Sequence, residues 1–158
     1  MQLVKENSTN EKKMKRLNVV SLQMIKERTF PFETNTIRDP KSVFKLVQEF
    51  IGYEDREHCI LICLDTKNRI TSIQTIAIGS LNAAIIHPRE CMKLAILSNS
   101  ASIILAHCHP SFDPSPSYED LELTKRLKAA GELIGIELID HVIVGGENHY
   151  SLKENGHL

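Results

Sequence analysis

The sequence predicts an α/β fold in which a mixed, curved β-sheet is flanked by three helices. Short runs rich in isoleucine, leucine and valine, typical of strands, alternate with longer amphipathic segments typical of helices. The helical segments begin at capping residues or prolines, and the first and the third end at glycines, as helices commonly do. The chain has 158 residues, 42% of them hydrophobic and 25% charged, which suits one globular domain with a sizeable core.

The first part of the chain differs in composition from the rest. Residues 1–16 are polar and of mixed charge, and we expect a mobile tail, with a short basic arm that touches nucleic acid as the alternative. Residues 17–158 form the predicted single domain. At its start, LNVVSLQMIKER (17–28) has the apolar pattern of a strand at a sheet edge. A helix follows, with Pro40 in the first position and Gly52 at its end.

A β-hairpin and a second helix come next. HCILICLD is a strand that ends near Asp65, TKNR makes the turn, and ITSIQTIAIG (70–79) is the returning strand. The following segment leads to a helix that begins at Pro88. The apolar residues of this helix are expected to face the core, namely Cys91, Leu94, Ala95 and Ile96.

The C-terminal half continues the alternation of strands and helices. An isoleucine-rich strand, residues 100–107, runs into a proline-rich loop, and a helix extends from the N-cap Ser117 to about Leu133. IELIDHVIVG (136–145) reads as a strand, a glycine pair turns the chain, and NHYSLKE (148–154) returns as a short last strand.

The loop AHCHPSFDPSPSYED contains three candidate metal ligands at fixed spacing. Because side chains alternate on a strand, His107 and His109 are expected to point to one side and Cys108 to the other. Asp120 lies eleven positions after His109, in the first turn of the predicted helix. This spacing allows the helix start to fold back over the strand end and bring a carboxylate to the two imidazoles.

Two imidazoles and one carboxylate suit a tetrahedral Zn²⁺ whose fourth position is open to water, the arrangement of a catalytic zinc site. Such an ion lowers the pKa of its water to about 7, so hydrolysis is the reaction indicated. Each fragment alone is ordinary, since His-x-His occurs at strand ends and Ser-x-x-Asp caps helices. Their combination on a strand, a proline-rich loop and a helix is far more specific, and we expect one Zn²⁺ per chain.

The stretch from His107 to Asp120 resembles the His-x-His, ten residues, Asp motif of the JAMM metalloproteases, which have the JAB1/MPN domain. It resembles most closely the loop HNHPSGDPTPSxxD of the bacterial RadC branch. The similarity continues through GSLNAAIIHPREC, LAILSNSASIILAH and GIELIDHVIVG, and covers roughly residues 40–155. Two departures stand out, Cys108 for asparagine and Phe112 for glycine. A glycine at the latter position serves a positive backbone angle or leaves room for substrate, so Phe112 affects loop shape and access.

This resemblance implies a JAB1/MPN-like fold, similar to that of cytidine deaminases, and zinc-dependent cleavage of a peptide or isopeptide bond. It also implies a glutamate base that opens the first core strand, which places Glu57 in that role. Glu54 and Glu90 remain alternative bases. The Ser117 hydroxyl is expected to donate a hydrogen bond to the developing oxyanion, with simple helix capping as the alternative. The other histidines, His141 among them, lack a partner at ligand spacing and receive no site role.

Charge and composition narrow the expected partners. The formal net charge is −1 and tryptophan is absent, so nucleic-acid binding is not supported, although the RadC family carries a DNA-repair name. We expect no helix-hairpin-helix segment before the domain. No apolar run is long enough to span a membrane, and no secretory signal is evident. The four cysteines form no Cys-x-x-Cys pair, and we expect them to be reduced in a cytoplasmic protein.

The sequence predicts a hydrolase with a peptide or protein substrate whose identity it does not give. Two other functions stay open: a metal-holding binding module with little peptidase activity, and an accessory protein associated with DNA repair. The oligomeric state is open as well, with a homodimer among the options.

Overall fold

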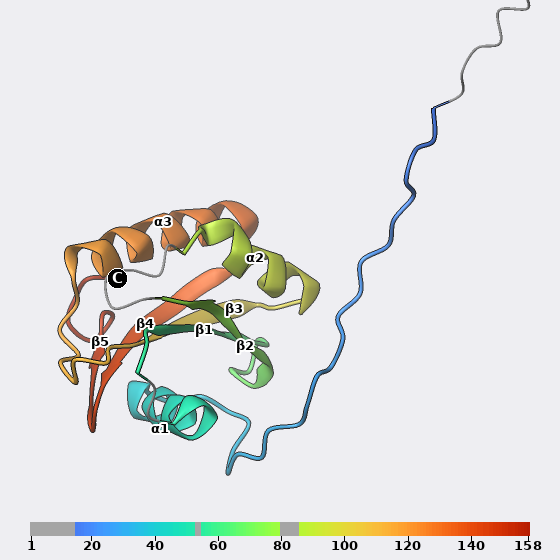
Figure 1. Ribbon diagram of the computed structural model, residues 1–158. Coiled ribbons are helices and arrows are strands. Elements are labelled where there is room, and N and C mark those ends of the chain that lie inside the picture. Colours follow the sequence, from blue (N-terminus) through green and yellow to red (C-terminus); the bar gives the residue numbers. More distant parts are fainter. Residues whose placement is uncertain (1–14, 53–54, 80–85) are drawn as a thin grey trace, which may run out of the picture.

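The computed structural model describes residues 15–52, 55–79 and 86–158. Within these residues the chain forms a five-stranded sheet in the order β2-β1-β3-β4-β5, in which only β3 and β4 are parallel. Helices α2 and α3 cover one face and α1 covers the other (Figure 1). The predicted mixed α/β architecture is confirmed. In chain order the elements are α1 (Pro40–Ile51), β1 (His58–Leu64), β2 (Ile70–Ile78), α2 (Pro88–Leu97), β3 (Ser102–Cys108), α3 (Tyr118–Ile134), β4 (Glu137–Gly145) and β5 (Asn148–Ser151).

The core lies in two layers because alternate residues of the central strands point to opposite faces of the sheet. Leu61 of β1 and Leu105 of β3 pack in the layer under α2 and α3. Their neighbours Ile60 and Ile104 pack in the layer under α1. All seven residues of β1 are buried, as expected for a strand covered on both faces. This alternation decides which side chains at the end of β3 reach α3.

Local capping signals explain where α1 and α2 begin. Asp39 caps α1 by accepting the Ser42 backbone N–H at 2.7 Å, and Pro40 occupies the first turn. Helix α2 begins at Pro88 as predicted. The expectation that Ile96 faces the core is wrong, since its side chain is 52% exposed. Each helical residue turns the chain by about 100°, which carries Ile96 away from the face that its neighbour Ala95 buries.

The N-terminal segment differs from the prediction. Residues 17–28 form no strand; they are extended and exposed, and they lead away from the folded body (Figure 1). An apolar pattern favours a strand only where a neighbouring strand completes the hydrogen bonds, and the described part of the chain supplies none here. Most of the predicted tail, residues 1–14, lies outside the described residues.

None of the helices in the described ranges is long and apolar enough to cross a membrane. All four cysteines are free thiols.

Candidate metal centre

The end of β3 places two histidines and a cysteine at the edge of the core. His107 is buried and reaches α3, whereas Cys108 packs against the layer under α1. These opposite directions are the ones that strand alternation predicted. His109 follows directly after the strand, where its backbone N–H donates to the Val144 carbonyl of β4 at 2.8 Å. The sheet therefore fixes the backbone of both histidines.

The first turn of α3 fixes the carboxylate of Asp120. The Ser117 hydroxyl oxygen accepts the Asp120 backbone N–H at 3.1 Å. In return, Asp120 Oδ2 accepts the Ser117 backbone N–H at 2.8 Å and the Ser117 hydroxyl at 2.7 Å. This is a capping box, in which each residue satisfies an amide of the other. The side chain of Asp120 is thereby oriented by the helix start itself.

Hydrogen bonds determine which ring nitrogen of each histidine keeps a lone pair available to a metal ion. His107 Nδ1 lies 2.9 Å from Asp120 Oδ1, and His109 Nδ1 lies 2.8 Å from the Asp113 carbonyl oxygen. Both partners are acceptors, so each neutral ring donates from Nδ1 and keeps a lone pair on Nε2. His107 Nε2 is buried and finds no hydrogen-bond partner among the described residues. The free nitrogens are therefore of the kind that ligates metal ions.

Glu57 stands at the free nitrogen of His107. It immediately precedes β1, and its Oε2 lies 3.7 Å from His107 Nε2. Glu57, His107 and His109 each offer a ligand atom, and these three atoms all lie within 4.8 Å of one another. On the other side, Asp120 Oδ2 lies 3.5 Å from His109 Nε2. Neighbouring ligands of one tetrahedral zinc ion are about 3.3 Å apart, which the 3.7 Å and 3.5 Å separations approach. His107, His109 and Asp120 do not fall together in one candidate group among the described residues, because the Asp120 carboxylate lies at Nδ1 of His107.

Of the two alternative candidates for the general base, Glu54 and Glu90, the structure describes only Glu90. Glu90 lies in the first turn of α2, where its carboxylate is half exposed and forms an ion pair with Arg89 at 3.2 Å. It belongs to neither candidate group of metal ligands in the described part of the chain. Glu54 lies outside the described residues.

The ionisation of the site follows from these contacts. Burial alone would raise the pKa of Asp120, but hydrogen bonds from the two histidines and from Ser117 outweigh it and hold the pKa well below its usual range. The hydrogen bond to the Asp120 carboxylate raises the pKa of His109, although burial opposes it. The site without a metal is therefore arranged around a permanent negative charge on Asp120.

Two further side chains, those of Thr124 and His141, support the helix turn that carries Asp120. The sequence did not indicate either of them. Thr124 Oγ1 donates to the Asp120 backbone carbonyl at 2.7 Å, so it accepts the Nδ1–H of His141, also at 2.7 Å. His141 is fully buried, and burial lowers its pKa to about 3, so the ring is neutral. It stacks on His107 with 6.2 Å between ring centroids, and its Nε2 has no partner in the described residues.

His141 forms a second candidate group of metal ligands together with His107 and Asp120. From the sequence, His141 received no site role because it has no partner at ligand spacing. One signal was available: a histidine within an otherwise apolar run is buried, and a buried imidazole needs hydrogen-bond partners.

The residue that departs from the RadC loop pattern adopts the conformation that glycine favours. Phe112 has φ of 63°, in the left-handed region, and its side chain is 63% exposed. A Cβ added at Gly146 would come within 2.9 Å of the phenyl ring, so the ring lies against the turn between β4 and β5. The expectation that a glycine there serves a positive backbone angle is confirmed.

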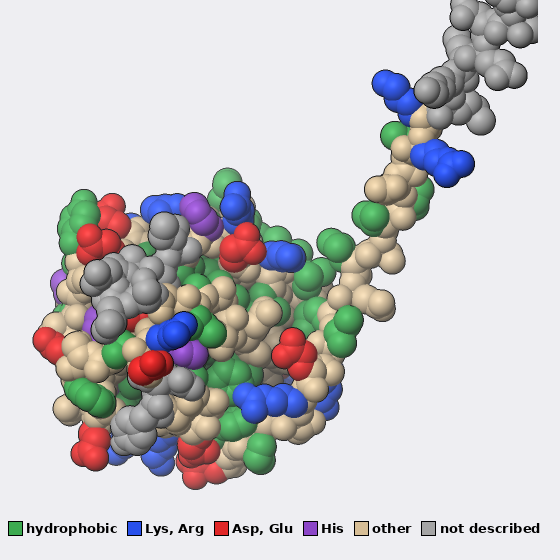
Figure 2. Space-filling model, viewed as in Figure 1, with side chains coloured by type: hydrophobic (Ala, Val, Ile, Leu, Met, Phe, Trp, Pro, Cys, Tyr) green, Lys and Arg blue, Asp and Glu red, His purple; other side chains and the backbone are tan. Residues whose placement is uncertain are grey.

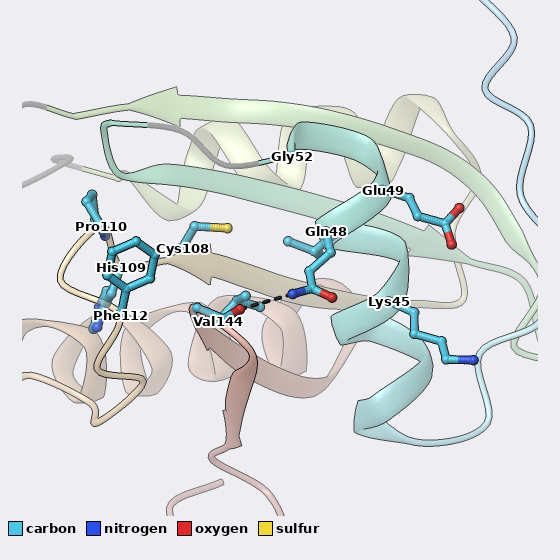
Figure 3. Close-up of a pocket in the computed structure, with 11 residues that line it drawn as sticks. Lys45, Gln48, Glu49, Gly52, Cys108, His109, Pro110, Phe112 and Val144 are labelled. Atoms are coloured by element: carbon cyan, nitrogen blue, oxygen red, sulfur yellow. Dashed lines mark hydrogen bonds between the residues drawn. The ribbon is translucent and has the colours of Figure 1, made fainter.

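A cavity of about 280 Å³ opens beside His109, between α1 and the loop that carries Phe112 (Figure 3). Gln48 of α1 closes one side by donating to the Gly146 carbonyl at 3.0 Å. Burial raises the pKa of Cys108, which lines the cavity, to about 12, so this thiol is protonated. The cavity is the concave feature next to the candidate ligands, as expected for a substrate site.

Comparison with known proteins assigns the family. The family model described as RadC-like JAB domain matches residues 37–157. The chain belongs to this family. It is similar to UPF0758 proteins of Desulfitobacterium hafniense (48% identity over 126 residues, 80% of this chain and 56% of the relative) and Halalkalibacterium halodurans (51% over 122 residues, 77% and 53%). A UPF0758 protein of Desulforamulus reducens is 50% identical over 127 residues, 80% of this chain and 56% of the relative.

The printed names of these relatives state no activity. The chain spans about half the length of the curated relatives that it matches. The family supports a JAMM-like metal-binding fold, and the activity of the site has to be argued from its geometry.

Proposed function

We propose that this protein is a zinc-dependent hydrolase of the JAMM type that cleaves an amide bond in a peptide or protein. The observation that carries the proposal is the position of the Glu57 carboxylate, with His109 beside it, 3.7 Å from the buried Nε2 of His107, which has no hydrogen-bond partner among the described residues. A buried imidazole nitrogen without a partner is costly unless something binds it. Nitrogen and carboxylate donors at these separations suit zinc.

In this proposal His107, His109 and Asp120 hold the ion. Zinc would supply Lewis acidity, which polarises a carbonyl group and brings the pKa of water to about 7. The Nδ1 hydrogen bond of His109 to the Asp113 carbonyl holds that ring in the tautomer that binds through Nε2, the orienting role of outer-shell partners in metal sites. For Asp120 to bind the ion together with His107, its carboxylate has to turn from His107 Nδ1 toward the ion. His141 and Thr124 in turn hold the helix turn that carries Asp120.

Glu57 acts as the general base and then as the general acid. Its carboxylate takes the proton from the attacking water at one oxygen and delivers that proton to the leaving nitrogen. Its side chain is 18% exposed, so it remains in reach of solvent while lying against His107. A carboxylate in that position can exchange a proton with water without entering the core.

Ser117 can cap the helix and serve the reaction together. Its oxygen accepts the Asp120 N–H, while its hydroxyl hydrogen points to Asp120 Oδ2. Rotation of that hydrogen toward the substrate leaves the cap intact. One such donor to a developing oxyanion contributes roughly 3 kcal/mol to transition-state stabilisation.

The test combines metal analysis with cleavage of a peptide library by the wild type, Glu57→Gln and His109→Ala. We expect one zinc per chain in the wild type and in Glu57→Gln, loss of zinc in His109→Ala, and cleavage by the wild type only. His157→Ala is the matched control, because His157 lies outside the site, where it contacts Tyr150. Zinc retained equally in His109→Ala would refute the site, and full activity of Glu57→Gln would refute the base.

A metal-holding binding module is the second candidate. The exposed Phe112 ring in the loop favours it, since an aromatic side chain there changes the surface next to the ligands. Specific zinc binding together with tight, uncleaved peptide binding would select this function. A DNA-associated role has no support in the net charge of −1.

A further inference from the structure

The segment before the folded body exposes an unusual amount of apolar surface. We call residues Leu17–Ile25 the arm; it is nine residues long and has no charged residue. Figure 2 shows apolar side chains along it where it extends from the body. Folded proteins rarely leave a contiguous apolar surface in water, so such a segment indicates a binding partner. Its large apolar side chains are between 48% and 98% exposed, namely Leu17, Val19, Val20, Leu22, Met24 and Ile25.

The apolar residues of the arm would fall on both sides of a strand. In an extended chain Leu17 and Val19 point one way, whereas Leu22 and Met24 point the other. A strand that is apolar on both faces is typical of one that lies in a sheet with both faces covered. The arm is therefore built to extend a sheet rather than to lie on a surface.

The β2 strand offers an open edge of matching length. It pairs with β1 on one side; on its other side, in the described residues, the only strand bridge joins Thr36 to Arg69 at its start. Its sequence, ITSIQTIAI, contains no charge and no proline, the residues that usually protect sheet edges from pairing. Its side chains reach both core layers, since Ile76 packs under α2 and α3 and Ile73 packs under α1.

The base of the arm lies close to this edge. The Ser98 hydroxyl contacts the Met24 sulfur at 3.6 Å and the Ser72 hydroxyl of β2 at 2.7 Å. From there the arm runs outward and away from its own sheet (Figure 1). Two copies facing each other across this edge can therefore each reach the β2 strand of the other.

We propose that two copies of this chain form a homodimer by exchanging arms, each arm pairing with the β2 edge of the partner. The exchange supplies main-chain hydrogen bonds to both unpaired edges and buries the apolar side chains of both arms. Because each copy gives an arm and receives one, the interface is symmetric and closed, which limits the assembly to two chains. The occupant is a second copy rather than another protein, since arm and edge share length, lack of charge and two apolar faces.

The first test is the mass of the assembly by light scattering at micromolar concentration. We expect twice the chain mass of 17.9 kDa for the wild type and a monomer for the double variant Val19→Asp, Leu22→Asp. Leu133→Asp is the matched control, because Leu133 is an apolar side chain on α3, 89% exposed and away from the arm in sequence, and its replacement should leave the dimer intact. A monomeric wild type, or a double variant that remains dimeric, would overturn the proposal.

The second test locates the contact. A photo-crosslinker at position 22 is used in a mixture of ¹⁴N- and ¹⁵N-labelled protein, and the products are mapped by mass spectrometry. We expect crosslinks from the arm to Ile70–Ile78 that join chains of different label. Crosslinks only within one chain, which would show an arm that folds back, or crosslinks to another surface, would also overturn the proposal. Neither test depends on zinc or on cleavage, so this inference stands or falls separately from the hydrolase function.

Discussion

Helices α1 and α3 begin with the same chemistry and differ in what surrounds it. At the start of α1, Asp39 accepts hydrogen bonds from the backbone and the hydroxyl of Ser42, and these bonds lower its pKa in full contact with water. At the start of α3, Asp120 accepts the same two kinds of bond from Ser117. Asp120 is buried, however, and its other oxygen meets His107 at 2.9 Å.

The comparison shows that a helix cap becomes a candidate metal centre through packing. Both helix starts join an aspartate to a serine three residues away, with Asp39 as the N-cap of α1 and Ser117 as the N-cap of α3, where the bonds of the first turn form a capping box. Only the placement of α3 over the end of β3 brings two imidazoles and a second carboxylate to that turn. The sharpest tests therefore make the same change at both helix starts.

The largest difference is expected from Asp→Asn at the two positions. Asp120→Asn removes a buried charge that accepts three kinds of donor, and we expect metal-free stability to fall by about 3 kcal/mol. Zinc affinity should fall by at least about 100-fold, since even outer-shell changes cost 10–100-fold. Asp39→Asn should change neither, because asparagine caps helices as well as aspartate. Urea unfolding and competition with a chelator measure both quantities; equal effects at the two positions would contradict the comparison.

The next difference is in pH dependence of the metal-free protein. The folded pKa of His109 is raised, so its contribution is fully present below the unfolded value of about 6.5 and is lost as pH rises through the folded pKa. The folded pKa of Asp120 is lowered, so its contribution is present above about pH 4 and is lost as pH falls. The stability advantage of the wild type over His109→Ala should therefore shrink as pH rises above about 6.5.

Thermal unfolding in the presence of a chelator across this range measures that advantage. Asp39→Ala is the control, since no histidine contacts Asp39 and its difference from the wild type should be flat above about pH 6. A wild-type advantage over His109→Ala that grows with pH would have the wrong sign. Zinc binding should show the opposite trend, because metal ions compete with protons for imidazole nitrogen.

Ser→Ala at the two helix starts should give a smaller contrast. Ser117→Ala removes the N-cap of α3 and one donor to Asp120, so we expect a loss of about 1 kcal/mol in stability and about 10-fold in zinc affinity. Ser42→Ala removes a hydroxyl that donates to Asp39 and should leave zinc affinity unchanged. Isothermal titration with zinc compares the two variants, and an equal loss of affinity in both would separate Ser117 from the site.

The smallest effect is expected in the loop that leads into α3. Among the described residues, the loop before α1 has no bulky residue with a positive φ, so this prediction has no counterpart at that helix. Phe112 has a positive φ that costs a bulky residue about 1 kcal/mol, so Phe112→Gly should raise the free energy of unfolding by up to that amount. Asn99→Gly is the control, since asparagine tolerates its φ of 50° with little strain. Urea unfolding measures the free energy of unfolding of both variants. A lower value for Phe112→Gly than for the wild type would show that the contacts of the phenyl ring outweigh the backbone strain.

The sequence predicted those elements whose ends are marked by local chemistry. Asp39, Pro40 and Gly52 mark α1, and Ser117 and Gly135 mark α3, so the predicted and observed helices agree within one or two residues. The motif from the end of β3 to the start of α3 was predictable for the same reason: its strand, loop and cap are each encoded by neighbouring residues.

What the sequence did not reveal depends on packing between distant segments. The support of Asp120 by Thr124 and His141 joins α3 to β4, and no local pattern encodes that contact. The apolar pattern of residues 17–28 predicted a strand, but in the described residues this segment pairs with no strand of its own chain. An apolar pattern indicates which side chains of a segment can be buried, but it does not indicate which other part of a structure covers them.

The most direct test of the metal centre is X-ray absorption at the zinc edge on protein loaded with one equivalent of zinc. The geometry predicts two imidazole nitrogens at about 2.0 Å, with the remaining neighbours oxygen at a similar distance, and no sulfur. The imidazole signal should stay unchanged in Cys108→Ser, whereas His109→Ala should hold no specific zinc. A sulfur neighbour at about 2.3 Å, or a zinc environment with no imidazole, would contradict the assignment of the ion to His107, His109 and Asp120.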